Sequence, residues 1–240
     1  MFNENNYIPK SITEIIFGNP ESQSIINDII NGLEPIPSLG VTGIILFGAY
    51  GTGKTTLAKL LPEAIEYGKT KQGLCIQPNF IACEQGNNGM NIITMIDKIL
   101  SSISFNESGN QYFIIDEIDN LTKAAQKSLK STLNKKFGIF ILTTNNISLL
   151  DKGLKDRCLL IEMNAAQPSQ FLPLANKVLT DLNLTLPAQE ILNIIADANG
   201  SVRKIPRNIV RQARLSAMQS SLVKSMPVIS KSSANNGAIF

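Results

Sequence analysis

The feature that most constrains the fold is a glycine-rich segment between a short apolar run and an amphipathic stretch. Residues 44–47 (IILF) are short enough for a buried parallel strand, and a helix is expected from Lys54 onward. The segment fits the pattern G-x-x-x-x-G-K-T, whose glycines let backbone N–H groups turn inward around phosphate oxygens. The predicted phosphate-binding residues are Gly48, Ala49, Tyr50, Gly51, Thr52, Gly53, Lys54, Thr55 and Thr56.

A second motif predicts what happens to the bound phosphates. Lys54 is expected to reach the β- and γ-phosphates of ATP, and the Thr55 hydroxyl to bind Mg²⁺. The apolar run at residues 112–115 ends in Asp116 and Glu117. Asp116 is expected to hold Mg²⁺, and Glu117 to polarise the attacking water as general base. Paired acids also occur in solvated turns, but after this glycine-rich loop they favour ATP hydrolysis over transfer to a small acceptor.

The remaining pattern predicts an α/β fold. Apolar runs near residues 79–83, 138–143 and 159–163 predict strands, and residues 20–30, 91–103 and 123–136 predict helices. This alternation predicts a parallel five-stranded sheet flanked by helices. Pro9 is expected to keep the N-terminal arm non-helical, and Pro62 to end or kink the helix from Lys54.

The pattern changes after Met163, where strand-like runs stop. Three helical stretches follow, at residues 170–182, 188–198 and 202–220. The predicted domains are therefore a nucleotide-binding domain at residues 1–164, a small helical lid at 165–222 and a flexible tail at 223–240. Residues 86–89 are expected to form a flexible turn.

Composition excludes several classes of chemistry. The chain contains no histidine, so histidine acid–base catalysis and imidazole metal sites are ruled out. Cys75, Cys83 and Cys158 match no zinc spacing and are expected to be reduced thiols in a cytoplasmic protein. No apolar run is long enough to span a bilayer, so no membrane is expected as a partner. The net charge of +3 is compatible with a nucleic-acid partner without arguing for one.

The order of five motifs resembles that of the AAA+ ATPases over residues 7–218: GAYGTGKTT, IIDEID, ILTTNN, KDRC and GSVR. Within that family the chain is most similar to clamp-loader (replication factor C-like) small subunits, through YIPKSITEI, AQKSLK and DRC. The resemblance implies that Asn145 orients the lytic water as sensor 1. It implies that Arg157 is an arginine finger inserted into a neighbouring subunit's ATP site, and that Arg203 is sensor 2, contacting the γ-phosphate from the lid.

Each implied role has an alternative. Asn145 also suits a simple turn, and Arg157 also suits a surface ion pair with Asp156 or Asp151. Arg207 competes with Arg203 because Pro206 could shift the start of the last helix. Tyr50 stands where the family usually has proline. The chain is expected to lack the helical collar that the resemblance implies, and assembly is then expected to rely on the ATPase faces, a partner or DNA.

The lysines after the acidic motif bear on whether the chain binds DNA. Lys123, Lys127 and Lys130 share one helix face, with Lys135 and Lys136 nearby, and such a face can follow the phosphates of duplex DNA or can simply be solvated. The first hypothesis is an oligomeric ATPase, built from copies of itself or homologous AAA+ subunits, that loads a sliding clamp or another client onto DNA. The second is a protein remodeller, disfavoured by polar residues 86–92. The third is a nucleotide-dependent scaffold on DNA, such as a helicase-loader-like filament.

Overall fold

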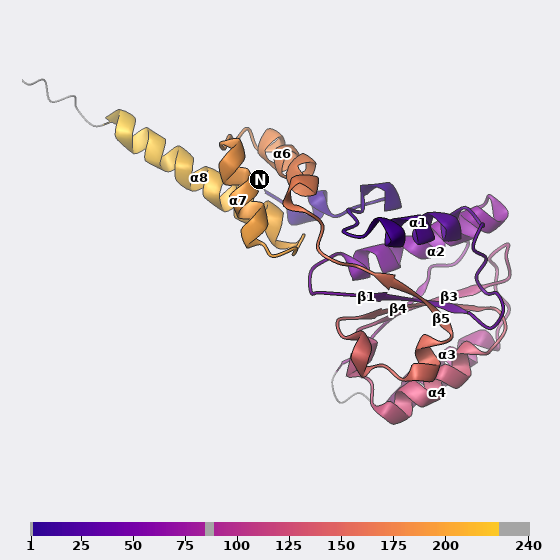
Figure 1. Ribbon diagram of the computed structural model, residues 1–240. Coiled ribbons are helices and arrows are strands. Elements are labelled where there is room, and N and C mark those ends of the chain that lie inside the picture. Colours follow the sequence, from indigo (N-terminus) through magenta and orange to yellow (C-terminus); the bar gives the residue numbers. More distant parts are fainter. Residues whose placement is uncertain (1, 85–88, 226–240) are drawn as a thin grey trace, which may run out of the picture.

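The computed structural model describes residues 2–84 and 89–225, and a parallel five-stranded sheet lies at its centre (Figure 1). The strands follow the order β2-β3-β4-β1-β5. The apolar side chains of the three central strands are nearly all buried, as expected for strands covered on both faces, whereas Phe80 and Leu160 on the two outer strands are exposed. The predicted sheet is confirmed. The strands are β1 (Gly43–Phe47), β2 (Asn79–Ala82), β3 (Gln111–Asp116), β4 (Gly138–Thr144) and β5 (Cys158–Glu162).

Helices cover the two faces of the sheet, and alternate strand residues serve the two layers. On one face α1 (Pro20–Ile30) and α2 (Lys54–Thr70) pack against Ile44, Leu46 and Tyr112. On the other, α3 (Gly89–Leu100) and α4 (Lys123–Leu133) pack against Ile45 and Phe113. Because all strands are parallel, the segments that follow β1, β3 and β4 leave the sheet at the same end, the carboxyl end of the strands. The glycine-rich loop, the acid pair and Asn145 lie at that end.

Pro62 does not end the helix that begins at Lys54. That helix, α2, continues through Pro62 as far as Thr70, so the predicted end was wrong. Proline removes a single backbone donor from the helix ladder. Leu61 and Ile65, beside it, are almost completely buried against the sheet, and this packing outweighs the local penalty.

Two predicted helices end earlier than their apolar pattern suggested. Helix α4 stops at Leu133 rather than at residue 136, and α3 stops at Leu100 although Ile103 continues its apolar spacing. The Gln111 side-chain amide donates to the Ile99 carbonyl, and the Ser102 hydroxyl donates to the same atom at 2.6 Å. These bonds satisfy the free carbonyl of the last turn and so terminate α3. Ile103 consequently lies 83% exposed.

The helices after the sheet, called the lid below, are η5 (Pro168–Phe171), α6 (Leu172–Asp181), α7 (Ala188–Asp197) and α8 (Lys204–Ser225). These helices lie beside the sheet, and α8 runs outward from the rest of the molecule (Figure 1). The N-terminal arm, with short 3₁₀ turns η1 (Glu4–Tyr7) and η2 (Ile12–Glu14), belongs to both parts of the molecule. Tyr7 is buried among the lid helices, whereas Ile15 packs under the sheet.

Three short elements complete the described chain: η3 (Ile118–Asn120), η4 (Ile147–Leu149) and α5 (Lys152–Lys155). The predicted turn at residues 86–89 lies mostly outside the described residues, and Gly89 is the first residue of α3. The predicted tail is described only as far as the end of α8 at Ser225. Within the described residues, none of the helices combines the length and apolar character needed to cross a bilayer.

Candidate active site

The glycine-rich loop folds tightly between the sheet and the lid. Gly48 has φ of 144°, and a Cβ there would lie 2.4 Å from the Met163 carbonyl oxygen. Gly51 has φ of 79°, and a Cβ there would lie 2.4 Å from the Ser201 hydroxyl. The Gly51 carbonyl also accepts a 2.9 Å hydrogen bond from the Val202 N–H. Only glycine suits these two positions, which join the loop to the strand behind it and to the lid in front.

Lys54 is buried at the start of α2, directly after the loop. Its ammonium group donates to the carbonyl oxygens of Gly48 at 3.0 Å and Ala49 at 2.6 Å. Burial lowers the pKa of Lys54, while the nearby carboxylates of Asp116, Asp119 and Glu117 favour its charged form. A cation thus sits inside the curve of the loop, where an anionic phosphate can compete for its donors.

Thr55, Asp116 and Thr143 form a hydrogen-bonded cluster where α2, β3 and β4 meet. The Thr55 hydroxyl donates to Asp116 Oδ1 at 2.9 Å, and the Thr143 hydroxyl donates to the same oxygen at 2.5 Å. A hydroxyl and a carboxylate side by side are hard oxygen donors of the kind Mg²⁺ prefers. The donor set fits the predicted metal, with Thr55 and Asp116 as the residues that would hold it. Sequence reasoning gave Thr143 no separate role.

Glu117 follows Asp116 at the exposed end of β3. Its backbone lies in the left-handed region (φ 58°, ψ 50°), so the chain turns sharply and the side chain is exposed. The Glu117 N–H donates to the Thr143 hydroxyl oxygen at 2.9 Å. The single Thr143 hydroxyl therefore fixes the backbone at Glu117 and the carboxylate of Asp116 together.

One cavity of about 950 Å³ brings most of the predicted residues together. Its walls come from the loop, the sheet edge, the lid and the N-terminal arm. Glu117, Asn145 and Arg203 all line it, although they lie far apart in sequence. The arm residues were not predicted to line the site. The residues contributed by the loop are Tyr50, Gly51, Thr52, Gly53, Lys54, Thr55 and Thr56, and those of the arm include Tyr7, Ile8, Pro9 and Lys10.

The lid offers two candidate arginines, and their surroundings differ. Arg203 is exposed and lines the cavity. Arg207 instead pairs with Glu4 of the arm, its Nη2 lying 2.7 Å from Glu4 Oε1. The geometry therefore favours Arg203 for contact with a bound nucleotide and gives Arg207 a partner in the arm.

Arg157 lies at the amino end of the strands, opposite the end that carries the cavity. It directly precedes β5, and its carbonyl accepts from the Thr42 N–H just before β1. The five-residue strand β1 thus separates it from Gly48, by roughly 16 Å at ~3.3 Å per residue. Its guanidinium donates to Asn134 Oδ1 at 2.7 Å and to the Gly153 carbonyl at 2.8 Å. Neither alternative ion pair, with Asp151 or Asp156, is among the salt bridges of the described residues.

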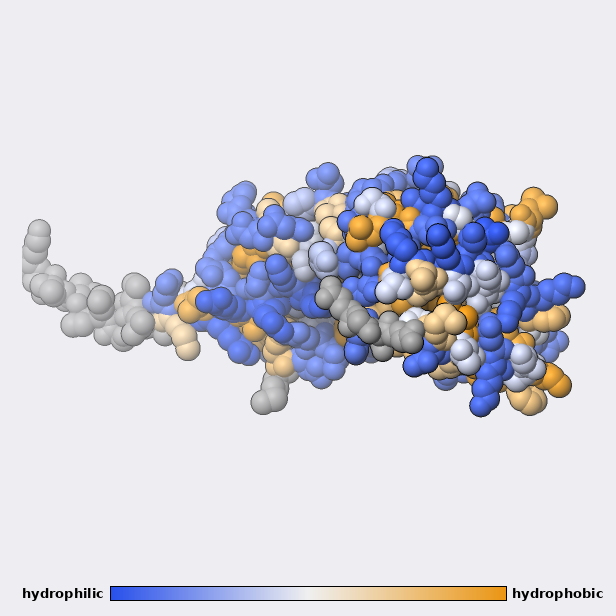
Figure 2. Space-filling view, turned by 90° about the horizontal axis from the view of Figure 1, so that it is seen from below, coloured by the Kyte–Doolittle hydropathy of each residue, from blue (hydrophilic) through white to orange (hydrophobic). Residues whose placement is uncertain are grey.

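The predicted lysine face is divided by local contacts. Lys123 Nζ donates to the Leu149 carbonyl, and the half-buried Lys130 stem packs against Gly153. Lys135 pairs with Asp97 at 2.7 Å. Lys127 and Lys136 are exposed. Seen from the side of α3 and α4, the molecule is mainly hydrophilic, with hydrophobic residues scattered among the polar ones (Figure 2).

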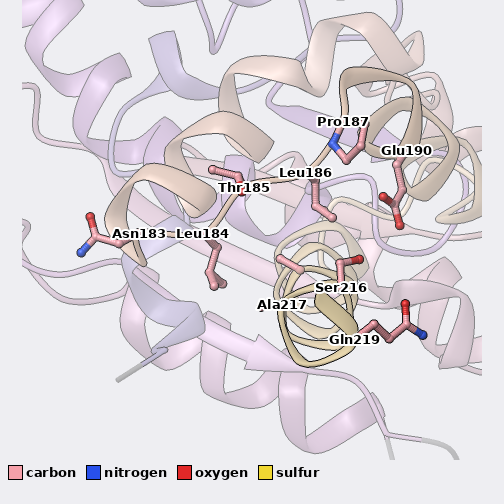
Figure 3. Close-up of a pocket in the computed structure, with 10 residues that line it drawn as sticks. Asn183, Leu184, Thr185, Leu186, Pro187, Glu190, Ser216, Ala217 and Gln219 are labelled. Carbon is pink, nitrogen blue, oxygen red and sulfur yellow. The ribbon is translucent and has the colours of Figure 1, made fainter. Parts of the chain in front are cut away.

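A separate hollow of about 890 Å³ lies within the lid. Leu184 and Leu186, from the segment between α6 and α7, face Ala217 of α8 across it (Figure 3). Glu190 and Gln219 stand at its margin. None of the predicted site residues lines this hollow, so it is distinct from the candidate active site.

Comparison with known proteins places this geometry in a family. The sequence model of the ATPase family associated with various cellular activities (AAA) matches residues 44–164, which is half of the chain. This chain belongs to the AAA family. The matched residues run from β1 to just past β5 and include the glycine-rich loop, the acid pair, Asn145 and Arg157.

Individual relatives of this AAA chain include replication proteins, which confirms the narrower resemblance expected from sequence. Replication factor C subunit 5 of Saccharomyces cerevisiae is 26% identical over 231 residues, covering 82% of this chain and 63% of that protein. The replication factor C small subunit of Methanococcus maripaludis is 26% identical over 202 residues, covering 82% and 60%. The DNA polymerase III subunit gamma of Buchnera aphidicola is 27% identical over 179 residues, covering 66% and 48%. The chain thus spans about half to two thirds of these relatives.

Solved structures agree on the fold. A RuvB variant from Thermotoga maritima matches with a TM-score of 0.63 at 17% identity, covering 91% of this chain and 67% of that one. The likeness extends over both the sheet and the helices that follow it. At this identity it shows the AAA fold of the chain and nothing of its partners.

Proposed function

We propose that this AAA chain is an oligomeric ATPase that hydrolyses ATP at the contact between two subunits while assembled on DNA. The position of Arg157 carries the proposal. The residues that suit phosphate, metal and water gather at the carboxyl end of the strands, and the arginine expected to complete the site is fixed at the amino end. An arginine so placed cannot serve its own chain's cavity, but it can serve that of a neighbour.

Each residue then has a task in hydrolysis. ATP binds in the cavity with its phosphates in the glycine-rich loop, where Lys54 exchanges its carbonyl partners for β- and γ-phosphate oxygens. Glu117 takes a proton from the attacking water, and Asn145 orients that water. The water oxygen forms a bond to the γ-phosphorus as the bond to ADP breaks. Arg203 and the neighbour's Arg157 stabilise the charge that builds on the γ-phosphoryl oxygens.

Mg²⁺ fits the same cluster. Thr55 and Asp116 would hold it, and when bound it would neutralise part of the phosphate charge. Thr143 orients the Asp116 carboxylate through their 2.5 Å hydrogen bond. Positioning of a ligating carboxylate by an outer hydrogen bond is a common requirement of such sites.

The DNA part of the proposal is supported by the replication proteins among the relatives and by exposed lysines. Four lysines on and after α4 are exposed, and two of them, Lys123 and Lys135, contact the Leu149 carbonyl and Asp97. The other two are Lys127 and Lys136. Two lysines suit contact with phosphates and give no means of reading base sequence. A clamp-loader-like role, with a clamp or another client protein as cargo, is the form of this function closest to the relatives.

The test combines assembly with activity. Particle mass with a slowly hydrolysed ATP analogue is expected to exceed the 26.1 kDa of one chain, and duplex DNA is expected to raise the ATPase rate. The variant Lys127→Ala/Lys136→Ala should lose the DNA stimulation and keep the basal rate. A chain that stays monomeric with nucleotide and DNA would contradict the proposal. Stimulation by an unfolded polypeptide instead of DNA would favour the protein-remodelling alternative.

A further inference from the structure

The Glu117 carboxylate is contacted by Asn120, which lies in the same turn of the same chain. Glu117 is exposed, and its long side chain has several rotamers open to it. In the described part of the chain, its carboxylate has one hydrogen-bond donor, Asn120 Nδ2, which lies 3.3 Å from Glu117 Oε2. A general base must lie within hydrogen-bond distance of the water whose proton it removes. A contact that limits the rotamers of Glu117 therefore affects how often its carboxylate is placed to act as a base.

Asn120 is itself anchored to the sheet. The same amide nitrogen donates to the Cys83 carbonyl oxygen at 2.8 Å. That carbonyl is well fixed, because the Cys83 N–H donates to the Asp116 carbonyl at 2.9 Å just past the end of β2. A primary amide has two N–H donors, and here one goes to each acceptor. The shorter bond fixes the amide plane and so aims the second N–H at Glu117.

The backbone of the turn is fixed as well. The Asn120 N–H donates to the Glu117 carbonyl at 3.0 Å, which closes the 3₁₀ turn η3. The Glu117 N–H is bound to Thr143. With both ends of the turn held, the distance between the Asn120 amide and the Glu117 carboxylate depends mainly on the side chain of Glu117.

We propose that Asn120 is a positioning residue that holds the Glu117 carboxylate toward the nucleotide cavity, using an amide anchored on the Cys83 carbonyl. The inference rests on the proposed function, because it takes Glu117 as the base. Asn120 touches neither ATP nor water in this role, and it acts only through Glu117. Its loss therefore lowers kcat and leaves ATP binding intact.

A double-mutant cycle tests the inference on the full chain. The rates of the native protein, Asn120→Ala, Glu117→Gln and the double variant are measured at saturating ATP, with single-turnover reactions for the slow forms. Asn120→Ala is expected to lower kcat about tenfold with KM for ATP changed less than about twofold. On the Glu117→Gln background the same substitution is expected to change the rate less than about twofold, since the group it positions is already gone.

Thr122→Ala is the matched control. Thr122 lies two residues further on, and its hydroxyl caps α4 by accepting from the Ala125 N–H at 3.2 Å. Its loss weakens the same segment without touching Glu117, so kcat should stay at the native value while thermal stability falls.

Two results would overturn the inference alone: a native kcat in Asn120→Ala, or an equal loss on both backgrounds. A native rate in Glu117→Gln would instead contradict the proposed base, and the inference with it.

Discussion

The hydroxyl of Thr143 donates to Asp116 Oδ1 at 2.5 Å and accepts from the Glu117 N–H at 2.9 Å. One buried side chain on β4 therefore aligns both acids at the end of β3. A hydroxyl can do this because it is donor and acceptor at once.

Replacing Thr143 with valine keeps its shape and removes that hydroxyl. We expect Thr143→Val to lower the ATPase rate roughly tenfold to hundredfold, the range typical for loss of a residue that orients a metal-binding carboxylate. The rate should also need more Mg²⁺ to saturate. Steady-state assays across a Mg²⁺ titration measure both effects. Thr132→Val, which removes a buried hydroxyl from α4, is the control, and equal rates for the two variants would refute the role of Thr143.

The two lid arginines are predicted to separate in their effects. Arg203→Ala should weaken ATP binding or hydrolysis roughly tenfold to hundredfold, since a hydrogen bond to a charged group contributes about 1.5–3 kcal/mol. Arg207→Ala should change the activity little, because its pair with Glu4 is exposed and such pairs contribute ~0–1 kcal/mol to stability. Fluorescent-nucleotide binding and ATPase assays compare the two. A larger loss in Arg207→Ala would show that the start of the lid helix was assigned to the wrong arginine.

The three cysteines are predicted to react at different rates. Burial and, to a lesser extent, the nearby carboxylate of Asp116 together raise the pKa of the Cys83 thiol to about 12. Burial likewise raises the pKa of Cys158, whereas Cys75 is exposed. At pH 8 only about one Cys83 thiol in ten thousand is ionised, and the thiolate is the nucleophile. Iodoacetamide with peptide mass mapping should modify Cys75 alone in the native protein and all three cysteines in denaturant. Modification of Cys83 at the rate of Cys75 would contradict its burial.

Much of the site was predictable because its signals are local. The loop from Gly48 to Thr55 needs glycines, a lysine and a hydroxyl at fixed positions, and the same few residues make the turn and bind the phosphate. Asp116 and Glu117 follow an apolar strand in the same way. Parallel strands all have their carboxyl ends at the same end of the sheet, so two local patterns are enough to predict that these groups lie close together.

The remaining features depend on contacts between residues far apart in sequence, which a local pattern does not show. Thr143 looks like an ordinary strand residue in the sequence, and its role becomes visible only because β4 lies beside β3 in the structure. Tyr7 shows no sign in sequence that it packs among lid helices nearly two hundred residues away. The end of α3 at Leu100 is set by Gln111, which lies beyond the helix, so the apolar spacing alone overextended it.

The central claim is that Arg157 acts on the nucleotide of a neighbouring copy, and a mixing experiment tests it most directly. Arg157→Ala should bind ATP normally and lose roughly a thousandfold or more in hydrolysis, the scale of arginine-finger effects. Lys54→Ala keeps Arg157 and loses its own phosphate site. Neither variant should turn over ATP alone, but mixed in varying ratios they should regain part of the native rate, because a Lys54→Ala chain can offer its arginine to an intact cavity. No recovery at any ratio, under conditions where the two variants co-assemble, would contradict action in trans.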